Sequence, residues 1–170
     1  IKYFLLAVDG MSKQVTTILY AVSALGVDGI SVYRSLTEHS SSKIRTIAWQ
    51  RFISLSDGWK DSSLWMPAMQ DRDKAVRNAV LNVLRGRTND LTEAELNKLV
   101  NNKFSDVRIF AAQSLLNAKQ DAVDSVGFDL LIDEDTIVRS TTIRAMSVRR
   151  VPGWIKILSR SLLDDDYVIQ

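Results

Sequence analysis

Four arginines recur at nearly equal spacing along this chain, and a row of guanidinium groups is chemically able to bind phosphates. The four are Arg45, Arg77, Arg108 and Arg139. Acidic residues lie in the segments before these arginines, so the same side chains could instead form a structural ladder of ion pairs. Exposed pairs contribute only about 0 to 1 kcal/mol each to stability. We favour the structural ladder and keep a ligand-binding row as the alternative.

Residues that could hold a metal ion or act as a nucleophile are scarce. The chain has no Cys and a single histidine, His39, which excludes thiolate sites and paired-histidine sites. Acid-rich runs at 71–73, 133–135 and 164–166 lack the spacing of a calcium-binding loop. No phosphate loop, nucleophile elbow or paired acid and base stands out. We therefore predict a protein that is not an enzyme and needs no metal or cofactor.

The composition indicates a folded protein with no strong electrostatic preference. Of its 170 residues, 46% are hydrophobic and 25% are charged, and the formal net charge is +2. Such a charge gives no field that favours nucleic acid or an anionic membrane. No apolar stretch reaches the roughly 20 residues of a membrane span, so we predict no membrane insertion. No secretion signal is recognisable, and the compartment stays unassigned.

A repeat of about 31 residues organises the chain. Its anchor is a β-branched residue followed by arginine, and the spacings are 32, 31 and 31 residues. The anchors are Ile44, Val76, Val107 and Val138. Weaker copies at Val15 and Val168 lack the arginine. The approximate repeats are 1–26, 27–57, 58–88, 89–120, 121–150 and an incomplete 151–170. Because the last repeat stops as a helix begins, we expect a fragment of a longer protein.

Each anchor begins an amphipathic helix, here called a B helix, because small or apolar residues follow at helical spacing. Residues able to cap a first turn precede the B helices, namely Ser42, Asp73, Ser105, Asp135 and Asp165. Shorter A helices are predicted at 30–36, 63–69, 92–100, 123–131 and 154–163. Thr92 and Glu95 form a capping box at the third A helix. Pro67 should bend or shorten the second.

Two short helices in about 31 residues cannot bury both apolar faces, so neighbouring repeats must stack. The pattern of Asp, a short gap, Val-Arg, small residues and Leu resembles the HEAT family, most closely the short HEAT-like repeats of the phycobilisome-lyase type. The resemblance covers nearly the whole chain. It implies an all-α fold, a right-handed α-solenoid of about five to six helical hairpins. It also implies that acids in the turns pair with the arginine ladder, and these acids are Asp71, Asp73, Asp133 and Asp135.

A second row of side chains lies six residues after each anchor, on the polar side of the B helices. Its members are Gln50, Asn82, Gln113 and Arg144. In a solenoid this row would line the concave surface, where amides and a guanidinium can hydrogen-bond an extended partner. We predict a non-catalytic scaffold that binds another protein, or another domain of its own chain, through this row. An ordinary solvated face is the alternative.

Two further functions stay open. HEAT-like DNA glycosylases surround a damaged base with aromatic residues, and this chain has Trp49, Phe52, Trp59, Trp65 and Trp154. A nucleic-acid-associated protein would also need a basic track, which the net charge does not favour. A lyase-like accessory protein that handles a chromophore rests on the resemblance alone.

A cationic edge is predicted near the ends of two B helices. It comprises Arg85, Arg87, Arg144, Arg149 and Arg150. An acidic partner could dock there, but cations near a helix C-terminus are also favourable through the helix dipole. We favour the second explanation.

The stacked architecture predicts two different responses to mutation. An insertion within 88–91 should be tolerated because it falls in a turn. Ala79→Asp or Ala111→Asp should unfold neighbouring repeats, because each is expected to bury an unpaired charge.

Overall fold

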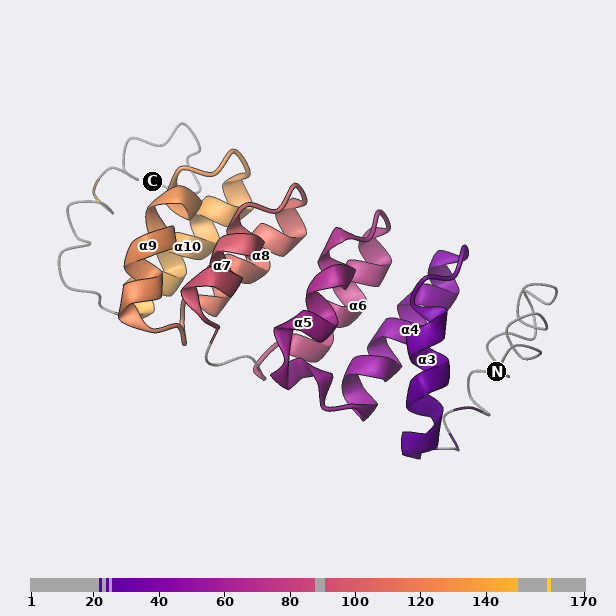
Figure 1. Cartoon of the computed structure of the whole chain (residues 1–170). Coiled ribbons are helices and arrows are strands. Elements are labelled where there is room, and N and C mark those ends of the chain that lie inside the picture. The colour runs from indigo at the N-terminus through magenta and orange to yellow at the C-terminus, as the bar shows by residue number, and fades with distance from the viewer. Residues whose placement is uncertain (1–21, 23, 25, 88–90, 150–158, 160–170) are drawn as a thin grey trace. The chain divides into compact units, whose positions relative to one another are not determined.

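All the regular secondary structure in the described part of the chain is helical (Figure 1). A computed structural model describes residues 22, 24, 26–87, 91–149 and 159. These residues form eight α-helices, α3 to α10, and three 3-10 helices, with no β-strand among them. The chain divides into two compact units, Ile1–Arg87 and Thr88–Gln170. The predicted all-α class is therefore confirmed.

Unit 1 is built around the long helix α4, which packs against both α3 and α6 (Figure 1). Its elements are η1 (Gly26–Gly29), α3 (Ile30–Leu36), α4 (Ser42–Leu55), η2 (Gly58–Lys60), α5 (Ser62–Trp65), η3 (Met66–Gln70) and α6 (Lys74–Leu84). Large side chains with no exposed surface fill the core, namely Tyr33, Leu36, Ile53, Trp65 and Met69. This core holds the segments before α4 and α6, in which the candidate site lies.

Local sequence explains where the second A helix of unit 1 ends and where α6 begins. The α-helix α5 stops at Trp65, and the chain continues as the 3-10 helix η3 with Pro67 in its first turn. The predicted shortening by Pro67 is therefore confirmed, since proline has no N–H for an α-helical bond. Asp73 caps α6 by accepting from the Ala75 backbone N–H at 2.8 Å.

Unit 2 contains two A helices and two B helices. They are α7 (Glu93–Val100), α8 (Ser105–Ser114), α9 (Gln120–Leu131) and α10 (Thr136–Arg149). Helix α7 packs against α9, and α8 packs against α10 (Figure 1). Thr92 and Glu95 form the predicted capping box at the start of α7. The two A helices therefore pack together, as do the two B helices.

The structure corrects the two predicted serine caps. Helices α4 and α8 begin at Ser42 and Ser105 themselves, so these serines lie inside the first turn. Their N-cap residues are Ser41 and Phe104, and neither makes a side-chain cap hydrogen bond. Asp135 does cap as predicted, accepting from the Ile137 N–H at 2.8 Å.

One of the two alanines predicted to be buried is not fully buried. Ala111 in α8 has no exposed surface, whereas Ala79 in α6 is only half-buried. The two alanines occupy different positions of the repeat. Ala111 lies four residues after its anchor Val107, whereas Ala79 lies three residues after its anchor Val76. The fourth position points into the core in both helices, and in α6 it is occupied by the fully buried Val80.

Several predicted features fall outside the described residues. They are the A helix at 154–163 apart from residue 159, the cap Asp165, the weak anchors Val15 and Val168, and residues 88–90 of the turn chosen for insertion. Among the helices that are described, none is long and apolar enough to cross a bilayer.

Candidate functional site

Each recurring arginine holds the turn that precedes its own B helix. One terminal guanidinium nitrogen, Nη1, donates to the backbone carbonyl six residues earlier in all four cases. The bonds are Arg45 to His39 O (2.9 Å), Arg77 to Asp71 O (2.8 Å), Arg108 to Asn102 O (3.0 Å) and Arg139 to Asp133 O (2.9 Å). Since the contact recurs in both units, it is a local property of the repeat.

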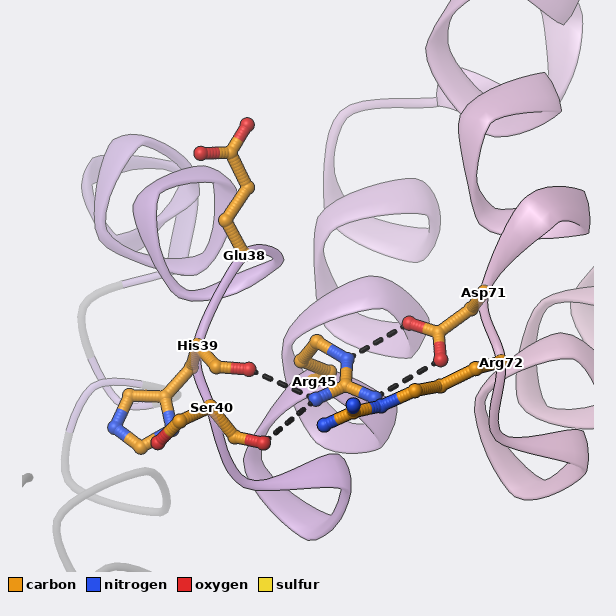
Figure 2. A pocket seen from close by; sticks show the side chains of 6 residues that line it. All are labelled: Glu38, His39, Ser40, Arg45, Asp71 and Arg72. Atoms are coloured by element: carbon orange, nitrogen blue, oxygen red, sulfur yellow. Dashed lines mark hydrogen bonds and ion pairs between the residues drawn. The ribbon is translucent and has the colours of Figure 1, made fainter.

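Two of these arginines also bind the turn of the following repeat in the same unit. In unit 1, Arg45 Nε lies 2.7 Å from Asp71 Oδ2 and Nη2 lies 2.9 Å from Oδ1 (Figure 2). In unit 2, Arg108 makes the same fork on Asp133, at 2.7 and 3.0 Å. The four side chains expose only 8 to 11% of their surface. We call each of these paired contacts a clasp.

The acid of each clasp also shapes its own turn. Asp71 Oδ1 accepts from the Asp73 N–H at 2.9 Å, and Asp133 Oδ1 accepts from the Asp135 N–H at 2.8 Å. Asn102 makes the equivalent bond, accepting from the Phe104 N–H at 3.0 Å. An amide is therefore sufficient for the turn, whereas the charged fork needs a carboxylate.

Asp73 and Asp135 were expected in the arginine ladder, but their geometry is that of helix caps. They lie two residues beyond the clasp acids and accept from the backbone at the start of α6 and α10. A hydrogen bond from Ser42 and one from the Ala75 N–H hold the pKa of Asp73 below its usual range. Burial raises the pKa of Asp135, but bonds from the Ile137 N–H and Ser105 outweigh it, so its pKa is also lowered.

The clasp in unit 1 lies in an open pocket (Figure 2). The pocket is lined by Glu38, His39, Ser40, Arg45, Asp71 and Arg72. Arg45 already makes four hydrogen bonds within the chain, two to Asp71 and one each to the carbonyls of His39 and Ser40. Because four of its five N–H groups are thus engaged, Arg45 is poorly placed to bind a phosphate.

Acid is expected to destabilise unit 1 through Asp71. Burial raises the pKa of Asp71, but hydrogen bonds from Arg45 and the Asp73 N–H hold it below its usual value. A carboxyl with a lowered folded-state pKa stabilises the fold above its unfolded pKa of about 3.9, and this stabilisation is lost as the pH falls through the folded-state value. Urea unfolding monitored between about pH 7 and pH 2 should show this loss.

Asp71→Asn is the variant that tests this assignment. It should be less stable at pH 7, and its stability should fall less steeply below about pH 4 than that of the wild type. The free energy of unfolding of the variant will still depend on pH, since Asp73 and Asp135 also have lowered pKa values. An unchanged slope in Asp71→Asn would show that the clasp acid does not govern acid stability.

The predicted polar row lies on packed B helices within each unit. Gln50 and Asn82 are exposed on α4 and α6 of unit 1. In unit 2, Gln113 is half-buried on α8 and Arg144 is exposed on α10. Within the part of the chain that the structure describes, none of these four side chains makes a hydrogen bond or ion pair. The clasp arginines Arg45 and Arg108, in contrast, donate hydrogen bonds to backbone carbonyls and to aspartates of the chain.

The cationic edge has a structural explanation at Arg149. Its Nη1 donates to the carbonyls of Leu115 at 2.7 Å and Ala118 at 2.6 Å, just after α8 ends. Arg149 in α10 therefore satisfies carbonyl groups beyond the C-terminus of a neighbouring helix. Arg85 and Arg87 are exposed, and Arg150 lies outside the described residues.

The aromatic residues of unit 1 are packed rather than gathered around a cleft. Trp65 has no exposed surface, and Trp49 and Phe52 form an edge-on pair with centroids 6.0 Å apart. Trp59 is half-buried with the Lys60 ammonium 5.1 Å from its ring centroid. Trp154 lies outside the described residues. No cluster of three metal-ligating side chains occurs among the residues described.

No protein-family model, curated protein or solved structure matches this chain. Sequence reasoning did not separate the two roles of the acids before the B helices. Asp71 and Asp133 pair with arginines, whereas Asp73 and Asp135 cap helices. The signal was the recurrence of Asp71, Asn102 and Asp133 at intervals of 31 residues.

Proposed function

We propose that this chain is a non-catalytic scaffold of HEAT-like repeats that binds another protein, or another domain of its own parent, through the polar row of its B helices. The observation that carries the proposal is the contrast between two sets of polar side chains. The arginine of each B helix is engaged inside the chain, whereas the row six residues after each anchor makes no described internal hydrogen bond. The row is thus available to a partner.

The repeated clasp supports the solenoid part of the proposal. Both units contain an arginine that forks onto an aspartate 25 or 26 residues later, and so connects one repeat to the next. A contact of this range, repeated at the period of the sequence, is what a stack of similar hairpins requires. We propose a right-handed α-solenoid on this basis, with the row on its concave side.

The chemistry of the row suits the backbone of an extended segment. Gln50, Asn82 and Gln113 each offer both donor and acceptor groups, so each can bond a peptide unit. Arg144 adds a guanidinium that can bind a carboxylate or a carbonyl oxygen. Each such bond contributes about 0.5 to 1.5 kcal/mol net, so the row as a whole could set the affinity.

Replacing the row by alanine should weaken partner binding strongly without unfolding the chain. The variant carries Gln50→Ala, Asn82→Ala, Gln113→Ala and Arg144→Ala. We expect partner affinity to fall about 30-fold or more, since each of the four lost bonds contributes roughly 0.5 kcal/mol or more. Because Gln50, Asn82 and Arg144 are exposed and Gln113 is half-buried without a hydrogen bond to the described residues, the thermal unfolding curve should shift little. Affinity capture from a lysate identifies the partner, and titration of the purified pair measures the loss.

A second quadruple variant provides the matched control. It carries Ser31→Ala, Gln70→Ala, Lys98→Ala and Lys119→Ala, all at exposed positions outside the B helices. This control should retain full affinity. Equal capture by both variants would reject the row as the binding surface. Salt-sensitive binding of labelled duplex DNA would instead favour the nucleic-acid alternative.

A further inference from the structure

Helix α9 of unit 2 presents two apolar side chains to solvent one turn apart. Phe128 exposes 41% of its surface and Ile132, which directly follows the helix, exposes 64%. The opposite side of the helix supplies the core, through Ala122, Val123, Val126, Gly127 and Leu130. Packing among the described residues of unit 2 therefore gives little reason for Phe128 and Ile132 to be apolar.

The neighbouring A helix α7 carries polar residues at the corresponding places. Asn102 and Asp133 make the same turn after α7 and α9, which aligns the two helices residue by residue. In this alignment Phe128 and Ile132 correspond to Asn97 and Asn101, 31 residues earlier. The exposed apolar pair is thus a departure of α9 from α7.

Exposed carboxylates border the pair on both sides. They belong to Asp121, Asp124 and Asp129. At about 100° of rotation per residue, Asp124 lies roughly 60° to one side of the apolar stripe, Asp129 lies roughly 80° to the other, and Asp121 continues the stripe. Asp124 accepts a bond from Gln120 at 2.8 Å, whereas Asp121 and Asp129 make no hydrogen bond or ion pair with the described residues.

We propose that this α9 face, formed by Asp121, Phe128, Asp129 and Ile132, docks a basic amphipathic helix of a separate protein. The apolar ridge of such a helix would cover Phe128 and Ile132. Lys or Arg residues beside its ridge would meet the carboxylates of Asp121 and Asp129, which gives charge complementarity along the contact. The proposal does not depend on the B-helix row, because it concerns another helix and another partner chemistry.

A designed peptide of leucine and lysine, about four helical turns long and amphipathic, is a suitable probe. Its binding to the intact chain can be followed by fluorescence anisotropy, and its position by chemical-shift changes. The test variant is Phe128→Asn with Ile132→Asn, which installs the amides that α7 carries. The matched control is Val148→Asn, a similar change at a side chain 67% exposed on α10.

The proposal predicts at least a tenfold loss of peptide affinity in the double variant and no loss in Val148→Asn. Asp121→Asn with Asp129→Asn should weaken binding several-fold and reduce its dependence on salt, because fewer charges face the peptide. Shift changes in the wild type should centre on α9. Each variant is checked by its thermal unfolding curve.

Three results would overturn the proposal. One is equal affinity of all variants for the peptide, and another is a preference for the same peptide with glutamate in place of lysine. The third is that the double variant loses self-association in sedimentation, or loses far more thermal stability than Val148→Asn. That result would show that a second copy, or another segment of this chain, covers the face.

Discussion

Replacing Ala111 by Asp is expected to unfold unit 2 at neutral pH. Ala111 has no exposed surface, and it lies on the side of α8 that also buries Val107 and Leu115. A carboxylate placed there loses its hydration without a designed partner, and the effective cost is several kcal/mol. Since a domain of this size has a total stability of about 5 to 15 kcal/mol, the loss takes most or all of it. Amide hydrogen exchange, which reports each unit separately, should show protection lost across α7 to α10.

Ala79→Asp is the matched comparison and should be much milder. Ala79 is half-buried on α6, so an aspartate there can turn its carboxylate toward water. We expect a smaller loss of stability, confined to unit 1. If Ala79→Asp proved as damaging as Ala111→Asp, the burial difference between the two sites would be wrong. If Ala111→Asp kept wild-type protection, the assignment of α8 to the core would fail.

The helices themselves could be predicted well from sequence because their signals are local. The apolar spacing after Val76 and Val107 placed α6 and α8, and the Thr92 capping box marked the start of α7 within one residue. Amphipathic periodicity and caps depend on neighbours three or four residues away, which a single sequence displays. The A helix α3 was likewise predicted with its observed bounds, 30–36.

The contacts that build the site could be predicted only in part, because they span long separations. Arg108 reaches Asp133, 25 residues away, and Arg149 reaches Leu115, 34 residues away. The sequence indicated that an acid pairs with Arg108. It did not indicate whether that acid is Asp133 or Asp135, because the two are chemically alike and only two residues apart. That choice depends on the turn geometry, which directs one carboxylate toward the guanidinium and the other toward a helix N-terminus.

The exposed pair on α9 illustrates a different limit. Val126 and Leu130 are equally apolar in the sequence, yet they are buried while Phe128 and Ile132 are exposed. The helical wheel separates the two groups only once the direction of the core is known. Comparison with α7 could have given that direction, since Asn97 and Asn101 mark the polar side one repeat earlier.

Asp133→Asn should cost unit 2 about 3 to 5 kcal/mol, the usual effect of breaking a buried ion pair by changing one partner. Asparagine can keep the turn, as Asn102 does, by accepting from the N–H of residue 135. Its amide nitrogen would then stand where Asp133 Oδ2 now accepts from Arg108 Nε at 2.7 Å. Two donors would face each other, and the buried guanidinium would lose its main counter-charge. Urea unfolding of the intact chain measures the change.

The adjacent glutamate separates this effect from a general loss of charge. Glu134 contacts the same guanidinium, at 3.1 Å from Arg108 Nη2, but its side chain is 86% exposed. Glu134→Gln should therefore cost only about 0 to 1 kcal/mol. Arg108→Met combined with Asp133→Asn should cost less than the sum of the two single changes, because neither buried charge is then left alone. Equal effects of Asp133→Asn and Glu134→Gln would mean that the clasp does not hold successive repeats together. The recurrence of the arginines would then need another cause, and a phosphate-binding row would again be the alternative to test.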